Sequence, residues 1–146
     1  MKRSKRGLRR RYGRSHDNGE SFFDAYVTAA LWSSNDESDD SGGVPLDSNY
    51  DASDIVADTR ADMRSDCARF QKANKALLRE AYARGYSKAQ AGHDFWLTRN
   101  GHGAGFWDRD ELDAGGLGKA LTAASKKFGG YNLYVGDNGK IDGSGG

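Results

Sequence analysis

The sequence predicts an α+β domain in which amphipathic helices pack on a small, mostly antiparallel sheet made of two hairpins. Three observations support this fold class. Apolar residues recur at three- and four-residue spacing in three long segments, which is typical of helices with one buried face. Two later segments, rich in aromatic and β-branched residues, each contain an Asn-Gly pair, a common hairpin turn. A length of 146 residues is enough for one such domain with a modest core.

Residues 1–16 are predicted to form a disordered basic arm. The segment has no acidic residue and too few apolar residues to offset the entropy lost on ordering. Dense positive charge of this kind is typical of electrostatic binding to nucleic acid, the function that the sequence favours. The alternatives to nucleic-acid binding are a solvated tail that aids solubility and a segment for import or membrane-surface binding. The eight basic groups are Lys2, Arg3, Lys5, Arg6, Arg9, Arg10, Arg11 and Arg14.

The rest of the chain is predicted to fold as a single α+β domain over residues 17–142, followed by a disordered tail at 143–146. A first helix is expected over 21–34. An acidic loop without apolar residues follows at 35–43, and it could fold back onto the basic arm. A long helix is then expected over 58–84, with a buried stripe made of Met63, Cys67, Phe70, Asn74, Leu77 and Ala81.

The second half of the chain is predicted to contain both hairpins. After a short helix at 87–91, strands at 95–98 and 106–107 would flank a turn at Asn100–Gly103, which gives a hairpin over 94–108. A further helix is expected over 113–128, where Gly129 and Gly130 would stop it. The second hairpin would join a strand at 131–135 to residues 140–141 through an Asn-Gly turn.

Composition argues against several classes of protein. No run of eighteen apolar residues is present, so we expect no membrane-spanning helix, and the basic N-terminus lacks the apolar segment of a secretory signal. The single cysteine, Cys67, excludes an internal disulfide, and no Cys/His spacing typical of zinc sites occurs. We therefore expect an intracellular protein without a metal, a cofactor or a membrane partner.

Two blocks of the sequence resemble a family of small phage- and prophage-encoded proteins. The first is GHDFWLTRNGHGAGFWDR at Gly92–Arg109, and the second is LYVGDNGKI at Leu133–Ile141. With Pro45–Asp47 and Cys67–Phe70, which fit the same pattern, the resemblance covers about residues 44–141. It implies a viral origin and a location in the host cytoplasm, but no particular reaction. Residues Arg109–Asp113 look like an insertion relative to this pattern, and the basic arm and acidic loop lie outside it.

The block at 92–109 allows three interpretations. In the first, its aromatic residues fill the core and its glycines permit close packing. In the second, it forms an outward-facing recognition surface, because aromatic and Arg side chains commonly anchor interfaces and stack on bases. The residues of that surface would be Trp96, Arg99, His102, Trp107 and Arg109.

The third interpretation is a catalytic or metal site that uses His93, Asp94 and His102. A five-residue strand would place His102 at the hairpin tip, far from His93, and would point His93 and Asp94 in opposite directions. General acid–base chemistry needs these groups within hydrogen-bond reach. The predicted hairpin therefore makes this the least favoured of the three.

The sequence as a whole predicts a non-enzymatic phage accessory protein that binds nucleic acid mainly through its basic arm, without sequence preference. The second hypothesis is an inhibitor that binds a host enzyme or defence factor, through the acidic region at 35–66 or through Trp96 and Trp107. The third is a small hydrolase or nuclease that uses His93, Asp94 and His102.

Overall fold

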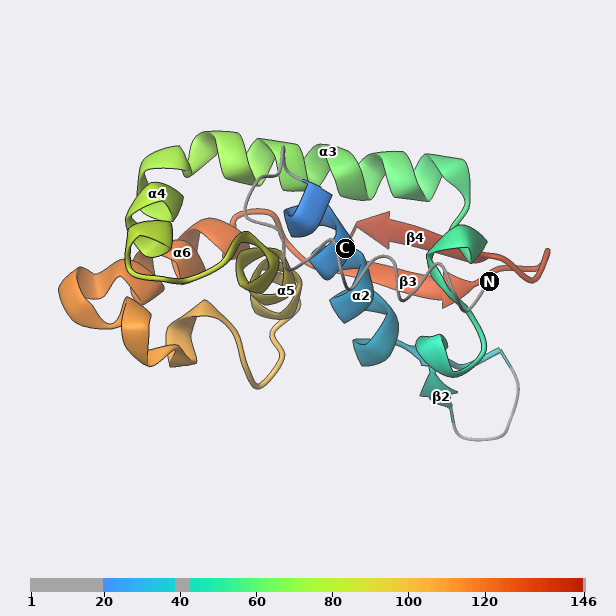
Figure 1. Ribbon diagram of the computed structural model, residues 1–146. Helices are drawn as coiled ribbons and strands as arrows, with labels where there is room; N and C mark the ends of the chain where they lie inside the picture. Colours follow the sequence, from blue (N-terminus) through green and yellow to red (C-terminus); the bar gives the residue numbers. More distant parts are fainter. Residues whose placement is uncertain (1–19, 39–42, 146) are drawn as a thin grey trace.

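The computed structural model describes residues 20–38 and 43–145. The predicted basic arm at 1–16 and residues 39–42 of the predicted acidic loop lie outside these ranges. The fold is α+β, as predicted: in the described residues, five α-helices pack with two small antiparallel sheets of two strands each (Figure 1). None of these helices is long and apolar enough to cross a membrane.

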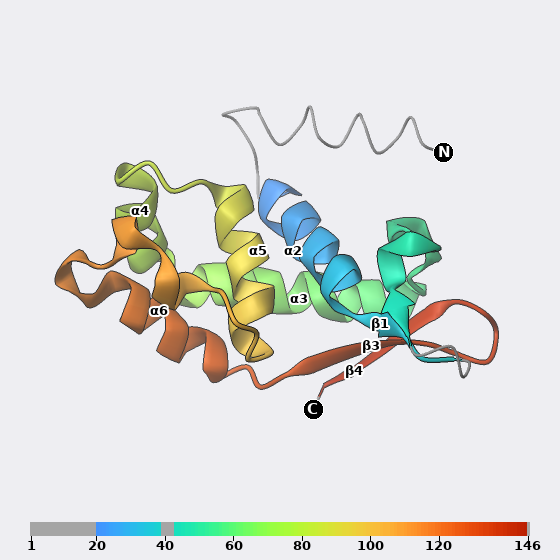
Figure 2. The ribbon, with the colours of Figure 1, turned by 90° about the horizontal axis from the view of Figure 1, so that it is seen from below.

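Two helices at the centre of the molecule, α2 (Glu20–Ser33) and α5 (Lys88–Arg99), lie side by side (Figure 2). Helix α2 confirms the helix predicted at 21–34 and buries residues on most of its circumference, as expected of a central helix. Their close approach depends on Gly92 of α5, since a Cβ atom at this position would lie 2.0 Å from the carbonyl oxygen of Phe22. The side chain of Ser87 begins α5 by accepting a hydrogen bond from the backbone N–H of Gln90.

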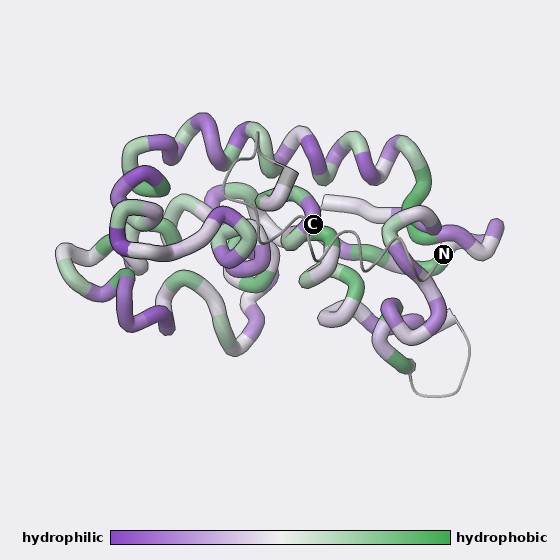
Figure 3. The backbone as a smooth tube through the Cα atoms, in the orientation of Figure 1, coloured by the Kyte–Doolittle hydropathy of each residue, from purple (hydrophilic) through white to green (hydrophobic). Residues whose placement is uncertain are grey.

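The long helix predicted at 58–84 is two helices, α3 (Ala57–Ala73) and α4 (Lys75–Ala83). The break lies at Asn74, which has φ −118° and ψ 30°, and whose side chain donates a hydrogen bond to the carbonyl oxygen of Phe70 at 2.9 Å. Asparagine side chains compete in this way with helical hydrogen bonds, which the apolar spacing does not reveal. The predicted buried stripe is confirmed for Met63, Cys67, Phe70 and Ala81, whereas Asn74 and Leu77 are only partly buried. Hydrophobic and hydrophilic residues alternate along α3 accordingly (Figure 3).

The core is built largely from aromatic rings. Phe70 of α3 stacks on Phe95 of α5 with 4.1 Å between ring centroids. Around this pair lie Phe22 and Tyr26 of α2, together with Phe106. Phe95 and Phe106 are fully buried, as the core interpretation of the 92–109 block predicts.

The hairpin predicted at 94–108 is wrong. Residues 94–99 are the last turns of α5, and residues 106–108 form a short 3-10 helix. The apolar run Phe95–Leu97 has no strand-like alternation in burial because the helix that carries it is buried on most sides. The Asn-Gly pair ends α5 instead of turning a hairpin: Asn100 is its C-terminal cap and Gly101 follows with φ +70°.

The helix predicted at 113–128 is shorter, as α6 (Leu117–Lys126). It begins late because Gly115 and Gly116 have φ of +73° and +72°, and two further 3-10 turns, Asp110–Leu112 and Ala114–Gly116, precede it. Glycine readily adopts this left-handed conformation, which an α-helix cannot include.

The hairpin predicted at 131–141 is confirmed and is longer than expected. Strand β3 (Tyr131–Val135) pairs antiparallel with β4 (Ile141–Gly145). The prediction of a disordered tail is therefore wrong for residues 143–145, which pair with Leu133, Asn132 and Tyr131. The other sheet joins β1 (Asn35–Asp36) to β2 (Val44–Pro45). The prediction of a loop at 35–43 is therefore wrong for residues 35–36, and β2 directly follows that segment.

Candidate functional site

The buried carboxylate of Asp94 is the centre of the first candidate site. It accepts hydrogen bonds from the hydroxyl of Tyr86 at 2.5 Å and from Nε and Nη2 of Arg109 at 2.9 and 2.7 Å. Gln90 approaches both oxygens at 3.3 Å, and Nδ1 of His93 lies 3.0 Å from Oδ1. His93 and Asp94 thus meet on α5, whereas the predicted strand would have pointed them apart.

Electrostatics fixes the charge state of this network. Burial raises the pKa of Asp94, but hydrogen bonds from His93, Arg109 and Tyr86 outweigh it and leave the pKa below its usual value. The hydrogen bond that Arg109 donates to Asp94 raises the pKa of Arg109, although partial burial lowers it. Burial and the neighbouring Asp94 charge raise the pKa of Tyr86, so its hydroxyl stays protonated and donates. Asp94 is therefore an anion held in an ion pair.

Asp94 should make the free energy of unfolding depend on pH in the acid range. Its pKa is lower in the folded chain than the value of about 3.9 in an unfolded chain, so the unfolded state takes up the proton first as pH falls. Its stabilising contribution is fully present above that value and is lost as pH falls through the folded-state pKa. In urea denaturation at neutral pH, Asp94→Asn should have a lower free energy of unfolding than the wild type. The difference in free energy between the two proteins should become smaller as the pH falls into the acid range. A constant difference would contradict the assignment.

The imidazole of His93 is oriented by the Asp94 carboxylate and is partly exposed. One ring nitrogen contacts Asp94, the side chain is 30% exposed, and the ring lies 5.9 Å from that of Trp32. A carboxylate that fixes the orientation of an imidazole is the usual arrangement of general acid–base pairs. His102, the third predicted catalytic residue, is not in this network but lines a separate cavity. In the described residues, no group of three or more His, Cys, Asp or Glu is placed to hold a metal ion.

Arg99, predicted to belong to a recognition surface, is buried, and that prediction is wrong. Its guanidinium donates to the carboxylate of Asp66 at 2.8 Å, to the hydroxyl of Tyr26 at 3.0 Å, and to the carbonyl oxygens of Phe128 and Gly129 at 3.0 and 2.7 Å. Although burial lowers its pKa, Tyr26 and Asp66 raise it further, so the group stays charged. Arg99 therefore ties α5 to α2, α3 and the segment after α6.

Trp96 was predicted on the same surface, and it too is buried. Only 2% of it is exposed, and its indole N–H donates to the hydroxyl of Ser33 at 2.8 Å. The reason is the helical geometry of α5, which turns Trp96 toward α2, where its ring contacts that of Tyr26 edge-on at 5.3 Å.

Part of the predicted recognition surface is exposed. Trp107 is 49% exposed, whereas Arg109 is partly buried against Asp94. Trp32, which the sequence reasoning did not single out, is 44% exposed near the end of α2. The one feature of the sequence that indicates exposure of Trp32 is its position just before a polar segment. In the described residues, the large exposed aromatic side chains thus come from three separate segments and not from one ribbon: they are Trp32, Trp107 and Tyr134.

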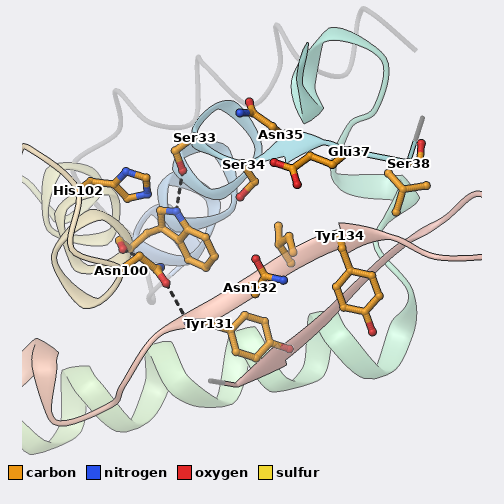
Figure 4. A pocket seen from close by; sticks show the side chains of 13 residues that line it. Ser33, Ser34, Asn35, Glu37, Ser38, Asn100, His102, Tyr131, Asn132 and Tyr134 are labelled. Atoms are coloured by element: carbon orange, nitrogen blue, oxygen red, sulfur yellow. Dashed lines mark hydrogen bonds between the residues drawn. The ribbon is translucent and has the colours of Figure 1, made fainter. Parts of the chain in front are cut away.

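The second candidate site is a cavity of about 430 Å³ that the sequence reasoning missed. Its lining comes from four segments: the end of α2, the residues of and after β1, the end of α5, and β3 (Figure 4). No local pattern reveals such a site, because its parts are far apart in the chain. The lining residues are Ser33, Ser34, Asn35, Glu37, Ser38, Trp96, Asn100, His102, Tyr131, Asn132, Leu133, Tyr134 and Val135.

Comparison of the chain with protein-family models, with curated proteins and with solved structures gave no match. The resemblance of residues 92–109 and 133–141 to small phage proteins therefore stays a prediction.

Proposed function

We propose that the protein binds nucleic acid through the basic residues of its first fourteen positions, without preference for sequence. The observation that carries this proposal is the separation of charge along the chain. Residues 1–14 contain eight Lys and Arg and no acid, whereas the residues that the structure describes contain 14 Lys and Arg against 18 Asp and Glu. The charge that attracts a polyanion is therefore concentrated in one short segment.

The internal pairing of two arginines supports this assignment. Arg99 and Arg109 belong to the aromatic block that would otherwise supply a binding surface, but Asp66 and Asp94 neutralise their charges. Phosphate groups would have to displace these carboxylates to reach either guanidinium. The pairing of these two arginines therefore supports the assignment of the phosphate contacts to the N-terminal basic residues.

Binding of this kind follows from counterion release and needs no catalytic step. Each Lys or Arg that contacts a phosphate releases condensed cations, and such contacts position a protein on nucleic acid without reading its sequence. An accessory role in a phage-infected host cytoplasm belongs to the same proposal, and it rests on the resemblance of the two blocks.

The experiment is a fluorescence-anisotropy titration of labelled duplex DNA at several salt concentrations. The logarithm of the association constant should fall linearly with that of the salt concentration. If all eight groups contact phosphates, at about −0.9 each, the slope should be about −7, which is the steepest slope expected. Two duplexes of unrelated sequence should bind alike. A chain lacking residues 1–14 should lose binding.

The control is a full-length variant in which Lys119, Lys126 and Lys127 of the folded part are changed to Gln, which should bind DNA with a nearly unchanged salt slope. Unchanged affinity after deletion of residues 1–14 would refute the proposal.

A second candidate function, binding to a host protein, is favoured by the exposure of Trp32 and Trp107. Large exposed aromatic side chains are common energetic centres of protein interfaces. The test is capture of a host protein from lysate. Capture that survives nuclease treatment and high salt would favour this function over the first, provided that Trp107→Ala abolishes it and deletion of residues 1–14 does not.

A further inference from the structure

The cavity lined by α2, α5 and β3 has the size of a small-molecule site and a mostly polar lining. Its volume of about 430 Å³ falls in the range of ligand pockets, roughly 300–1,000 Å³. Figure 4 shows Asn132 on β3 below Ser34 and Glu37 of the segment that follows α2, whereas the ring of Tyr134 points away from that segment. Nothing in the proposed nucleic-acid binding uses this cavity.

The floor of the cavity is held rigid by hydrogen bonds within the protein. Ser33 donates to the carbonyl oxygen of Ala29 at 2.6 Å and accepts from the indole of Trp96. Asn100 donates to the carbonyl oxygen of Trp96 at 3.0 Å and accepts from the backbone N–H of Tyr131 at 2.8 Å. A fixed floor lowers the entropy lost when a ligand binds.

Other polar groups in the lining are uncommitted. The side chains of Asn35, Glu37 and Asn132 make no hydrogen bond or ion pair within the described part of the chain. Each amide can both donate and accept, and the carboxylate can accept from two directions. Beside them, the ring of Tyr134 is 43% exposed and offers an apolar face.

The charge of the lining restricts the kind of ligand. Among the residues that the structure describes, no Lys or Arg lines the cavity, and Glu37 is the one acidic residue in the lining. A phosphate or carboxylate ligand would meet no Lys or Arg among these residues and would be repelled by Glu37. A neutral ligand rich in hydrogen-bonding groups suits the amides, the carboxylate and the serine hydroxyl groups.

We propose that this cavity binds a neutral saccharide. Sugar hydroxyl groups donate and accept hydrogen bonds at once, which matches the amides of Asn35 and Asn132 and the carboxylate of Glu37. The less polar C–H face of a sugar ring would pack on the ring of Tyr134. This function is independent of nucleic-acid binding, because it involves none of the N-terminal basic residues.

The test is an NMR titration of the full-length, ¹⁵N-labelled protein with maltotriose, cellotriose and chitotriose. Adenosine, uridine and inorganic phosphate form parallel arms. At least one trisaccharide should cause saturable shifts of the side-chain amides of Asn35 and Asn132 and of the Trp96 indole N–H. Phosphate should cause none. The proposal is overturned if no trisaccharide shifts these signals, or if the nucleosides bind as well as the best sugar.

Three variants test the site itself. Asn132→Ala should weaken binding of the active sugar at least about tenfold. Ser144→Ala is the matched control, because Ser144 pairs with Asn132 across the hairpin but does not line the cavity, and its affinity should be unchanged. Glu37→Gln should retain binding within about threefold, since the amide keeps an acceptor and the ligand carries no charge. Complete loss in Glu37→Gln would indicate a cationic ligand and overturn the proposal.

Discussion

Replacing Arg99 with Met should lower the free energy of unfolding by about 3 kcal/mol or more, because removal of one partner of a buried ion pair leaves the other uncompensated. Met keeps a long apolar side chain beside the rings of Phe95, Phe128 and Tyr131, which the guanidinium now contacts. The loss therefore reports the missing hydrogen bonds to Asp66, Tyr26 and two carbonyl oxygens. Urea denaturation followed by tryptophan fluorescence measures it.

Arg69→Met is the matched control for Arg99→Met. Arg69 donates to the same carboxylate, that of Asp66, at 2.7 Å, but 64% of its side chain is exposed. Exposed ion pairs contribute about 0–1 kcal/mol, so this variant should lose less than about 1 kcal/mol. Equal losses in the two variants would show that burial does not set the contribution of Arg99.

The burial of Arg99 and Trp96 explains why the sequence wrongly predicts them on a recognition surface. Both residue types are common at interfaces, and a single sequence does not distinguish an exposed guanidinium from one enclosed by partners. The carboxylate that pairs with Arg99 lies 33 residues away, at Asp66, and the hydroxyl that pairs with Trp96 lies 63 residues away, at Ser33. Such partners follow from the packing of helices and not from local pattern.

Other parts of the fold were predictable because their signals are local. Helix α2 and strand β3 follow from apolar spacing, and the turn between β3 and β4 follows from Asn138 and Gly139. The Asn100-Gly101 pair carried the same signal but ends a helix. At both sites the glycine, Gly101 or Gly139, takes a positive φ, so only tertiary packing decides between a hairpin and a helix end.

The candidate sites were predictable only in part, for the same reason. His93 and Asp94 were singled out by residue type, but their contact depends on α5 being a helix where a strand was expected. The cavity depends on the approach of α2, α5 and β3, and none of its uncommitted amides stands out in the sequence.

Replacing Gly92 with Ala should destabilise the protein by about 3 kcal/mol, through the contact between α2 and α5. The new Cβ atom would lie 2.0 Å from the carbonyl oxygen of Phe22 and 2.8 Å from its carbonyl carbon, and backbone atoms cannot turn away as a side chain can. The two helices must therefore separate, and overpacking of this kind costs about 1–3 kcal/mol or more. Helix propensity alone predicts the opposite sign, a gain of about 1 kcal/mol for Ala over Gly.

Gly103→Ala is the control for the direction of this change in stability. A Cβ atom at Gly103 would meet nothing within 4 Å, and its backbone does not have positive φ, so the free energy of unfolding should stay within about 0.5 kcal/mol. In Gly92→Ala the separation of the helices should also shift the indole N–H resonance of Trp96, since that group bridges α5 to Ser33 of α2. A Gly92→Ala protein of wild-type or greater stability, with this resonance unmoved, would mean that α2 and α5 do not cross at Gly92. The position of Arg99 and the floor of the cavity, which both depend on that crossing, would then have to be reassigned.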